Sequence, residues 1–256
     1  AMILRYWYLL KSSWPRLLEL VYWPTVQMFM WGFLQSYLHE QEGILALAGG
    51  ALLGAVLLWD ILFRGQIGFS ISFLEEMWAQ NLGHLMISPL RAGEFAVALM
   101  TMSLIRVLIG LVPVTVLALV FFGFNIYQLG LALAGFFVVL IVTSWSIGLL
   151  VCGLVLRQGL GAESLVWSLI FLLLPLTCVY YPVSTLPDWL QYVALALPPT
   201  HVFEGMRSIL IAGVSRPDLL VTALALNLVY LAAGLIVFFA LLRTARIHGS
   251  LLLSGE

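Results

Sequence analysis

Six long apolar stretches dominate this chain and limit what it can fold into; they cover residues 17–38, 43–64, 93–122, 129–156, 164–181 and 217–243. About 20 apolar residues in a helix cross the hydrocarbon core of a bilayer, and a helix satisfies its own backbone polar groups there. The chain is 63% hydrophobic and 9% charged, whereas a soluble domain is about half apolar and about a quarter charged. The sequence therefore predicts one all-α integral membrane domain, residues 1–256, with six transmembrane helices.

Three segments outside these spans carry their own helical patterns. Residues 2–16 mix Trp and Tyr with Arg and Lys, which favours a helix lying in the membrane interface. A frayed extension of the first span is the alternative. Residues 73–87 and residues 182–213 are expected to form an amphipathic helix and a re-entrant helical hairpin, respectively.

The 73–87 helix is predicted to begin near Phe73, because Ser72 and Glu75 have the spacing of a capping box. Met77 and Trp78 belong to its apolar stripe, and an exposed stripe needs a partner protein or the membrane surface to cover it. The acidic side chains beside it either contact that partner or form a solvated face near the helix start. Candidate partner-contact residues are Glu75, Glu76, Met77, Trp78 and His84.

Prolines divide the 182–213 hairpin into two short helices. Pro187 suits the first position of a helix, whereas Pro198 and Pro199 end that helix. Thr200 is expected to cap the second helix and Gly213 to end it. Spacing of three residues places polar side chains on one face of the second helix; the candidate gate residues are Pro187, Trp189, Pro198, His201, Glu204 and Arg207.

The distribution of cations predicts the orientation, because short cytoplasmic loops are enriched in Lys and Arg. With both termini cytoplasmic, eight of the 11 cations fall on the inner side and two, Arg207 and Arg216, on the outer side. The eight are Arg5, Lys11, Arg16, Arg64, Arg91, Arg157, Arg243 and Arg246. The 73–87 helix then faces the cytoplasm, and the hairpin faces outward.

Polar groups inside the spans should have partners. Arg106 lies within the third span, where an arginine costs about 2.5–3.5 kcal/mol on insertion scales. It lines either a transport path or dimer seam, together with Trp31 and Tyr180, or it forms a structural pair. Asp60 and Arg64 are four residues apart and can pair, and Asn227 suits a hydrogen bond between helices.

Several functions are excluded by what the sequence lacks. Lys11 is the sole lysine, so no phosphate-binding Gly-x-x-x-x-Gly-Lys loop exists. The four histidines are far apart in the sequence and form no zinc-protease motif, so we expect no metal site, no cofactor and no catalytic residue. A net charge of −1 gives no reason to expect nucleic acid.

Three parts of the chain resemble the ABC-2 type transporter permeases. Asn81 to Glu94, with Ser88-Pro89-Leu90 at its centre, resembles the segment before the third span of that family. Residues 181–207 resemble the segment before its last span, through Leu186 to Leu190, Leu197 to Thr200, and Glu204 to Arg207. The interfacial helix followed by six spans is similar to the layout of the whole family.

This resemblance implies the membrane subunit of a bacterial inner-membrane exporter. It implies a homodimer, less often a heterodimer, bound to two copies of a cytoplasmic ATPase that holds ATP and Mg²⁺. It also makes the 73–87 helix a coupling helix that docks on the ATPase. The implied substrates are amphipathic, glycan, lipid-linked or drug-like. The alternative is a membrane enzyme or scaffold acting on lipids through His201, Glu204 and Arg207.

Overall fold

The computed structural model describes residues 2–39 and 44–248, and every regular element in these residues is helical. The all-α expectation is confirmed for them. The longer helices are α1 (Met2–Lys11), α2 (Trp14–His39), α3 (Ile44–Trp78), α5 (Ala92–Phe122), α6 (Leu131–Gln158), α7 (Ser164–Leu176), α9 (Pro198–Ala212) and α10 (Pro217–His248). The shorter ones are α4 (Leu82–Ile87), α8 (Asp188–Leu195), η1 (Ile126–Leu129), η2 (Leu160–Ala162) and η3 (Val183–Thr185).

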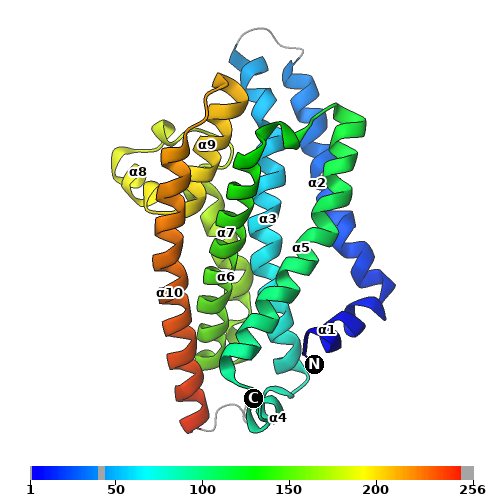
Figure 1. Ribbon diagram of the computed structural model, residues 1–256, viewed down its shortest axis with the longest axis vertical. Helices are drawn as coiled ribbons and strands as arrows, with labels where there is room; N and C mark the ends of the chain where they lie inside the picture. The colour runs from blue at the N-terminus through cyan, green and yellow to red at the C-terminus, as the bar shows by residue number, and fades with distance from the viewer. Residues whose placement is uncertain (1, 40–43, 249–256) are drawn as a thin grey trace.

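The long helices run side by side along the long axis of the molecule (Figure 1). Helix α4 lies at one end, where α1 begins and α10 ends, and α8 and α9 lie near the other. We call these the α4 end and the α9 end. Helix α6 packs between α3 and α10, and α3 also packs against α2 and α5. Residues Ala51–Trp78 of α3 are mostly buried by these neighbours, whereas few residues of Pro217–Ala245 in α10 are buried.

Four helices in the described residues are long and apolar enough to cross a membrane: α3, α5, α6 and α10. Helix α2 has 26 residues but is less apolar, because polar and amphipathic side chains such as Gln27 and Gln35 interrupt its aliphatic residues. Helix α7 is apolar but has only 13 residues, which is shorter than the predicted span at 164–181. The boundary expected between the first two spans, at residues 38–43, falls mostly outside the described residues.

Small and polar residues bring the long helices together. A Cβ on Gly148 of α6 would lie 2.6 Å from the Phe69 ring of α3, so the absence of a side chain permits this contact. Asn227 of α10 donates to the Val139 carbonyl and accepts from the Thr143 hydroxyl, both in α6, at 2.8 and 2.7 Å. The predicted role of Asn227 as an interhelical hydrogen-bonding residue is confirmed.

The prediction that a separate helix begins near Phe73 is wrong. Helix α3 continues without a break from Ile44 to Trp78. The Ser72 hydroxyl donates to the Gly68 carbonyl at 2.9 Å, as a serine inside a helix does, instead of accepting from a backbone N–H as a cap. The predicted 73–87 helix is divided into the last turns of α3 and α4, with Gln80 at a φ of 52° between them.

Two other predicted boundaries also need correction. The N-terminal helix expected at residues 2–16 ends at Lys11, and α2 begins at Trp14. In the hairpin, Leu197 rather than Thr200 precedes α9, with Pro198 and Pro199 in its first turn. Prolines are tolerated there because the first N–H groups of a helix have no partner inside it. Gly213 ends α9 in the left-handed conformation, as predicted.

Candidate functional site

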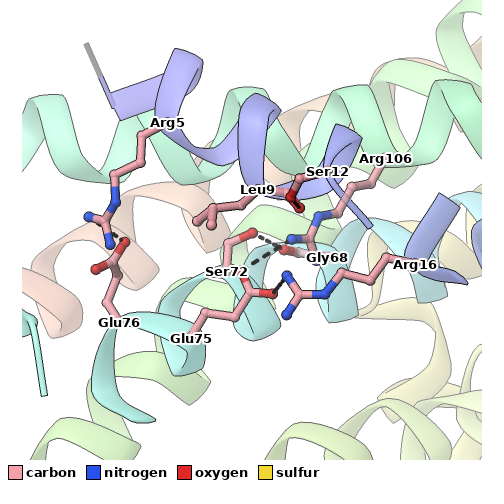
Figure 2. A network of polar contacts seen from close by, with 9 residues as sticks. All are labelled: Arg5, Leu9, Ser12, Arg16, Gly68, Ser72, Glu75, Glu76 and Arg106. Atoms are coloured by element: carbon pink, nitrogen blue, oxygen red, sulfur yellow. Dashed lines mark hydrogen bonds and ion pairs between the residues drawn. The ribbon is translucent and has the colours of Figure 1, made fainter. Parts of the chain in front are cut away.

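Two adjacent glutamates near the end of α3 bind arginines from different parts of the chain (Figure 2). Glu76 accepts from Arg5 of α1 at 3.0 Å and from the Asn81 amide at 2.7 Å, and its side chain is only 1% exposed. A buried carboxylate needs such partners, because burial of an unpaired charge costs several kcal/mol. Glu76 therefore holds α1 against the α4 end of α3.

Glu75 joins three helices. One carboxylate oxygen accepts from Arg16 of α2 at 3.1 Å, and the other lies 3.4 Å from the guanidinium of Arg106 in α5. Figure 2 shows the carboxylate between these two arginines. Arg16 and Arg106 share one carboxylate, so these three side chains together have a net charge of one positive unit.

Tyr6 of α1 is buried beside the same glutamates. Burial raises the pKa of its phenol above the ordinary value, and the negative charge of Glu76 raises that pKa further. The phenol is therefore neutral at ordinary pH. Together with Leu10, it makes one face of α1 part of the protein core, so the protein interior as well as any membrane surface holds this helix.

A cavity of about 650 Å³ lies between α2, α3, α5 and α7, next to the Glu75 group. Its charged and polar lining comes from Arg16, Glu19, Gln27, Arg64, Glu75 and Arg106. Its aromatic lining comes from Trp23, Phe63, Trp167 and Phe171. A cavity of this size, with apolar walls and a few charged groups, has the features of a binding site for a small molecule.

Arg64 of α3 forms the second charged group in this cavity. Its Nε donates to the Asp60 carboxylate at 2.6 Å, and the two side chains are 10% and 5% exposed. The pair predicted from their spacing is therefore confirmed. A Cβ on Gly110 of α5 would lie 2.8 Å from the Leu20 carbonyl of α2 and 3.4 Å from Arg64 Cδ, so this glycine lets the three helices approach.

The residues predicted to contact a partner protein do not share one surface. Glu75 and Glu76 are engaged by arginines, and Met77 is buried. Trp78 is 47% exposed, with its indole N–H 3.3 Å from the Glu163 carboxylate, and His84 is also exposed. Only Trp78 and His84 of the five are therefore available at the surface of the α4 end.

The predicted gate residues hold the α9 end together. Arg207 donates to the carbonyls of Cys178 and Val179 at 2.9 and 3.1 Å and to Glu204 at 3.0 Å. Glu204 also accepts from the Val183 amide at 2.8 Å. Both side chains thus link α9 to the segment that follows α7. They therefore stabilise the structure of the α9 end.

The remaining hairpin candidates are divided between core and surface. His201 is buried, and its Nε2 lies 2.8 Å from the Leu195 carbonyl. Pro198 is also buried, whereas Trp189 of α8 is 69% exposed and Pro187 lies just before α8. Since the polar side chains on this face already bond to the chain itself, the arrangement gives no support to a catalytic site on lipids.

The three residues suggested for a transport path are only partly brought together. Trp31 of α2 stacks on Tyr180, with ring centroids 4.6 Å apart and planes at 19°. Arg106 lines the cavity, whereas neither aromatic does. Of the two interpretations left open for Arg106, the structural pair is present, with Glu75. Arg106 also faces a cavity, and its place in a transport path or dimer seam stays a prediction.

The partners of the glutamates and the aromatic walls of the cavity are not predicted from the sequence. The charge distribution assigns Arg5 and Arg16 only to the inner side of the membrane, and no pattern assigns Trp23 or Trp167 to a site. One signal was available, since Arg106 within a span and the adjacent acidic residues Glu75 and Glu76 each require partners of opposite charge. The pairing itself depends on how α1 and α2 fold back, which no local pattern encodes.

These features define an integral membrane protein built from helices, with a charged cavity within its bundle. A family model described as ABC-2 type transporter matches residues 3–211, which is more than half of the chain. The chain therefore belongs to the ABC-2 type transporter family and is a permease component of an ABC transporter. A search among curated proteins found no match to it.

Proposed function

We propose that this chain is the membrane-spanning subunit of a bacterial ATP-driven exporter. Two copies would assemble with two copies of a separate cytoplasmic ATPase, which holds the ATP and Mg²⁺. In the proposal α2, α3, α5, α6, α7 and α10 are the six spans, and an amphipathic, glycan, lipid-linked or drug-like molecule leaves the cytoplasm. Membership of the ABC-2 family is the observation that carries this proposal.

The proposal places the α4 end in the cytoplasm. Cations gather at the helix termini of that end, where Arg91, Arg157 and Arg243 lie in or beside α5, α6 and α10. In the described part of the chain, Arg207 and Arg216 are the only Lys or Arg residues at the α9 end. This asymmetry agrees with the preference of cytoplasmic loops for Lys and Arg.

In this orientation the turn between α3 and α4 becomes the docking surface for the ATPase. Trp78 and His84 are exposed there, and the left-handed Gln80 gives the turn a defined shape. An exposed tryptophan is typical of the few residues that dominate protein–protein binding. Glu75 and Glu76 would transmit movement from this turn to α1, α2 and α5 through their ion pairs.

The test is copurification of the ATPase with the double variant Trp78→Ala/His84→Ala, purified gently from native membranes. We expect the amount of bound ATPase to fall about tenfold or more, since a tryptophan hot spot contributes about 2 kcal/mol or more to binding. Trp189→Ala is the matched control, because this tryptophan is exposed on α8 at the other end. Equal amounts of ATPase with both variants would contradict the docking surface, and no ATPase with the native chain would contradict the exporter.

A further inference from the structure

The cavity contains two arginines that the protein itself does not fully satisfy. The side chains of Arg64 and Arg106 are each only 10% exposed, and both line the cavity. A guanidinium offers five N–H donors, and buried donors without acceptors are costly. Arg106 therefore has a strong requirement for a further acceptor at its buried Nε, whereas the terminal amino groups of Arg64 can donate to water or to a ligand in the cavity.

The contacts of each arginine show which of its N–H donors have no acceptor among the described residues of the protein. Arg64 uses its Nε for Asp60, and no hydrogen bond or ion pair from residues 2–39 or 44–248 reaches its two terminal amino groups. Arg106 approaches Glu75 at 3.4 Å, longer than the roughly 2.7–2.9 Å of a good charged hydrogen bond. Its buried Nε has no acceptor in the described part of the chain.

The charges around the cavity are balanced, so a net charge is not what attracts a ligand. Arg64 is matched by Asp60, and Arg106 is matched by Glu75. Arg16, whose side chain is 49% exposed, and Glu19, which is also exposed, are opposite charges that water screens more effectively than it screens the buried groups. The attraction for an anion therefore comes from the N–H donors of the two arginines that the described part of the protein leaves without acceptors.

The other walls are apolar and aromatic. Trp23 contributes from α2, Phe63 from α3, and Trp167 and Phe171 from α7. A volume of about 650 Å³ lies within the range of roughly 300–1,000 Å³ of sites that hold small organic ligands. The cavity thus places the buried side chains of Arg64 and Arg106 beside a surface that suits the hydrocarbon chain or rings of a ligand.

We propose that this cavity binds an anionic amphiphile, with its acidic group at Arg64 and Arg106 and its apolar body against the tryptophans and phenylalanines. The inference deepens the proposed function, on which it rests, by assigning the transported molecule to a chemical class. Arg64 is the principal anion-binding residue, because its terminal amino groups have no partner in the described chain. The acidic group can belong to a membrane lipid or to a soluble amphiphile.

The test measures equilibrium binding of tritiated dodecyl phosphate to the full chain in complex with its ATPase, in a neutral maltoside detergent. The double variant Asp60→Asn/Arg64→Gln removes the arginine without leaving a buried unpaired carboxylate. We expect it to bind about tenfold more weakly or worse, because charge-assisted hydrogen bonds to a buried anion are lost. Arg243→Gln, at an exposed position outside the cavity, should leave binding unchanged.

A second variant tests whether weaker binding of dodecyl phosphate results from loss of folding. Asp60→Asn alone keeps Arg64 and removes the carboxylate that competes for it, so we expect dodecyl phosphate to bind as tightly as to the native chain or more tightly. Each variant is compared at equal monodispersity. Weaker binding by Asp60→Asn to the same degree as by the double variant would overturn the assignment to Arg64.

Two fluorescent lipids identify the source of the anion. Saturable binding of tail-labelled phosphatidylglycerol, reduced in the double variant, would support a lipid ligand. Binding of dodecyl phosphate without binding of this lipid would support a soluble amphiphile. Equal binding of phosphatidylglycerol and phosphatidylcholine, insensitive to the double variant, together with unaltered dodecyl phosphate binding, would overturn the proposal.

The same preparation separates this inference from the exporter proposal. If the ATPase copurifies and dodecyl phosphate does not bind saturably, the anion site is wrong and the exporter stands. If dodecyl phosphate binds to a chain that purifies without any ATPase, the anion site is supported and the exporter is wrong.

Discussion

At the scale of single residues, Glu76 is the clearest example of a charge kept for structural reasons. Its side chain is 1% exposed and is held by Arg5 and Asn81. Replacement by glutamine keeps the shape and removes the charge, while Arg5 can still reach water because it is 41% exposed. The change should therefore weaken the docking of α1 without leaving a buried unpaired charge.

We predict that Glu76→Gln lowers the free energy of unfolding by about 1–3 kcal/mol, the size expected for a hydrogen bond to a charged group. The measurement is thermal unfolding in detergent, with an earlier loss of protection in α1 by hydrogen exchange. Glu19→Gln is the matched control, because Glu19 is exposed and forms no ion pair within residues 2–39 and 44–248. Equal melting temperatures for the two variants would count against this role.

The pKa of Tyr6 leads to a prediction about how the stability of the protein depends on pH. Its pKa is raised in the folded protein, first by burial and then by the charge of Glu76. The unfolded chain ionises near the ordinary value of about 10, so above that pH it releases a proton that the folded chain retains. The stability contributed by the neutral phenol is therefore complete below about pH 10 and is lost as pH rises further.

Tyr6→Phe should accordingly reduce the loss of stability between about pH 9 and pH 11, since phenylalanine cannot ionise. Melting temperatures measured across this interval check the prediction, with Tyr8→Phe as the control on the exposed face of α1. A decline identical in the native chain and in Tyr6→Phe would show that Tyr6 does not contribute to it.

At the scale of helices, the contact between α3 and α6 depends on Gly148. A methyl group there would approach the ring of the fully buried Phe69 to 2.6 Å, so the ring or the helix has to move. We predict that Gly148→Ala destabilises the protein by about 1–3 kcal/mol through overpacking. Gly93→Ala is the matched control, because no atom lies within 4 Å of its added Cβ.

Gly93 lies near the start of α5, where alanine favours the helix by up to about 1 kcal/mol over glycine. Gly93→Ala should therefore be neutral or slightly stabilising. Denaturation in a fixed detergent, with both variants compared at the same protein concentration, measures the two changes. Similar destabilisation by both would contradict the Phe69 contact as the cause, because helix propensity favours alanine over glycine at both positions.

At the scale of the whole molecule, the proposed orientation can be tested with two cysteine variants. Gly161→Cys lies in η2 at the α4 end, and Val214→Cys lies after α9 at the opposite end; both positions are exposed. The native Cys152 and Cys178 are buried and should give little background. We predict that a membrane-impermeant maleimide labels Val214→Cys in intact cells and Gly161→Cys only after permeabilisation.

Labelling in the reverse order would place the α4 end outside the cell and contradict the proposed ATPase docking surface. Labelling of both positions in intact cells would contradict an odd number of spans between them. Background labelling of the native chain is the control for Cys152 and Cys178. The experiment is independent of the substrate, so it tests the topology alone.

The helical membrane class follows from the amino-acid sequence alone, because apolar stretches of this length satisfy their backbone polar groups in a bilayer as helices. The sequence also determines local features that depend on a few neighbouring residues, such as the Asp60–Arg64 pair and the end of α9 at Gly213. Each of these follows from spacing or from the conformational freedom of one residue.

The meeting of the charged side chains depends on how the helices pack. Arg16 and Arg106 lie far from Glu75 in the sequence, and their meeting depends on α2 and α5 packing beside α3. The continuation of α3 through Ser72 was likewise decided by packing, since the local capping signal predicted a break there. The cavity and its two arginines with unused N–H donors arise from this packing, because burial, unlike spacing, is a property of the assembled helices.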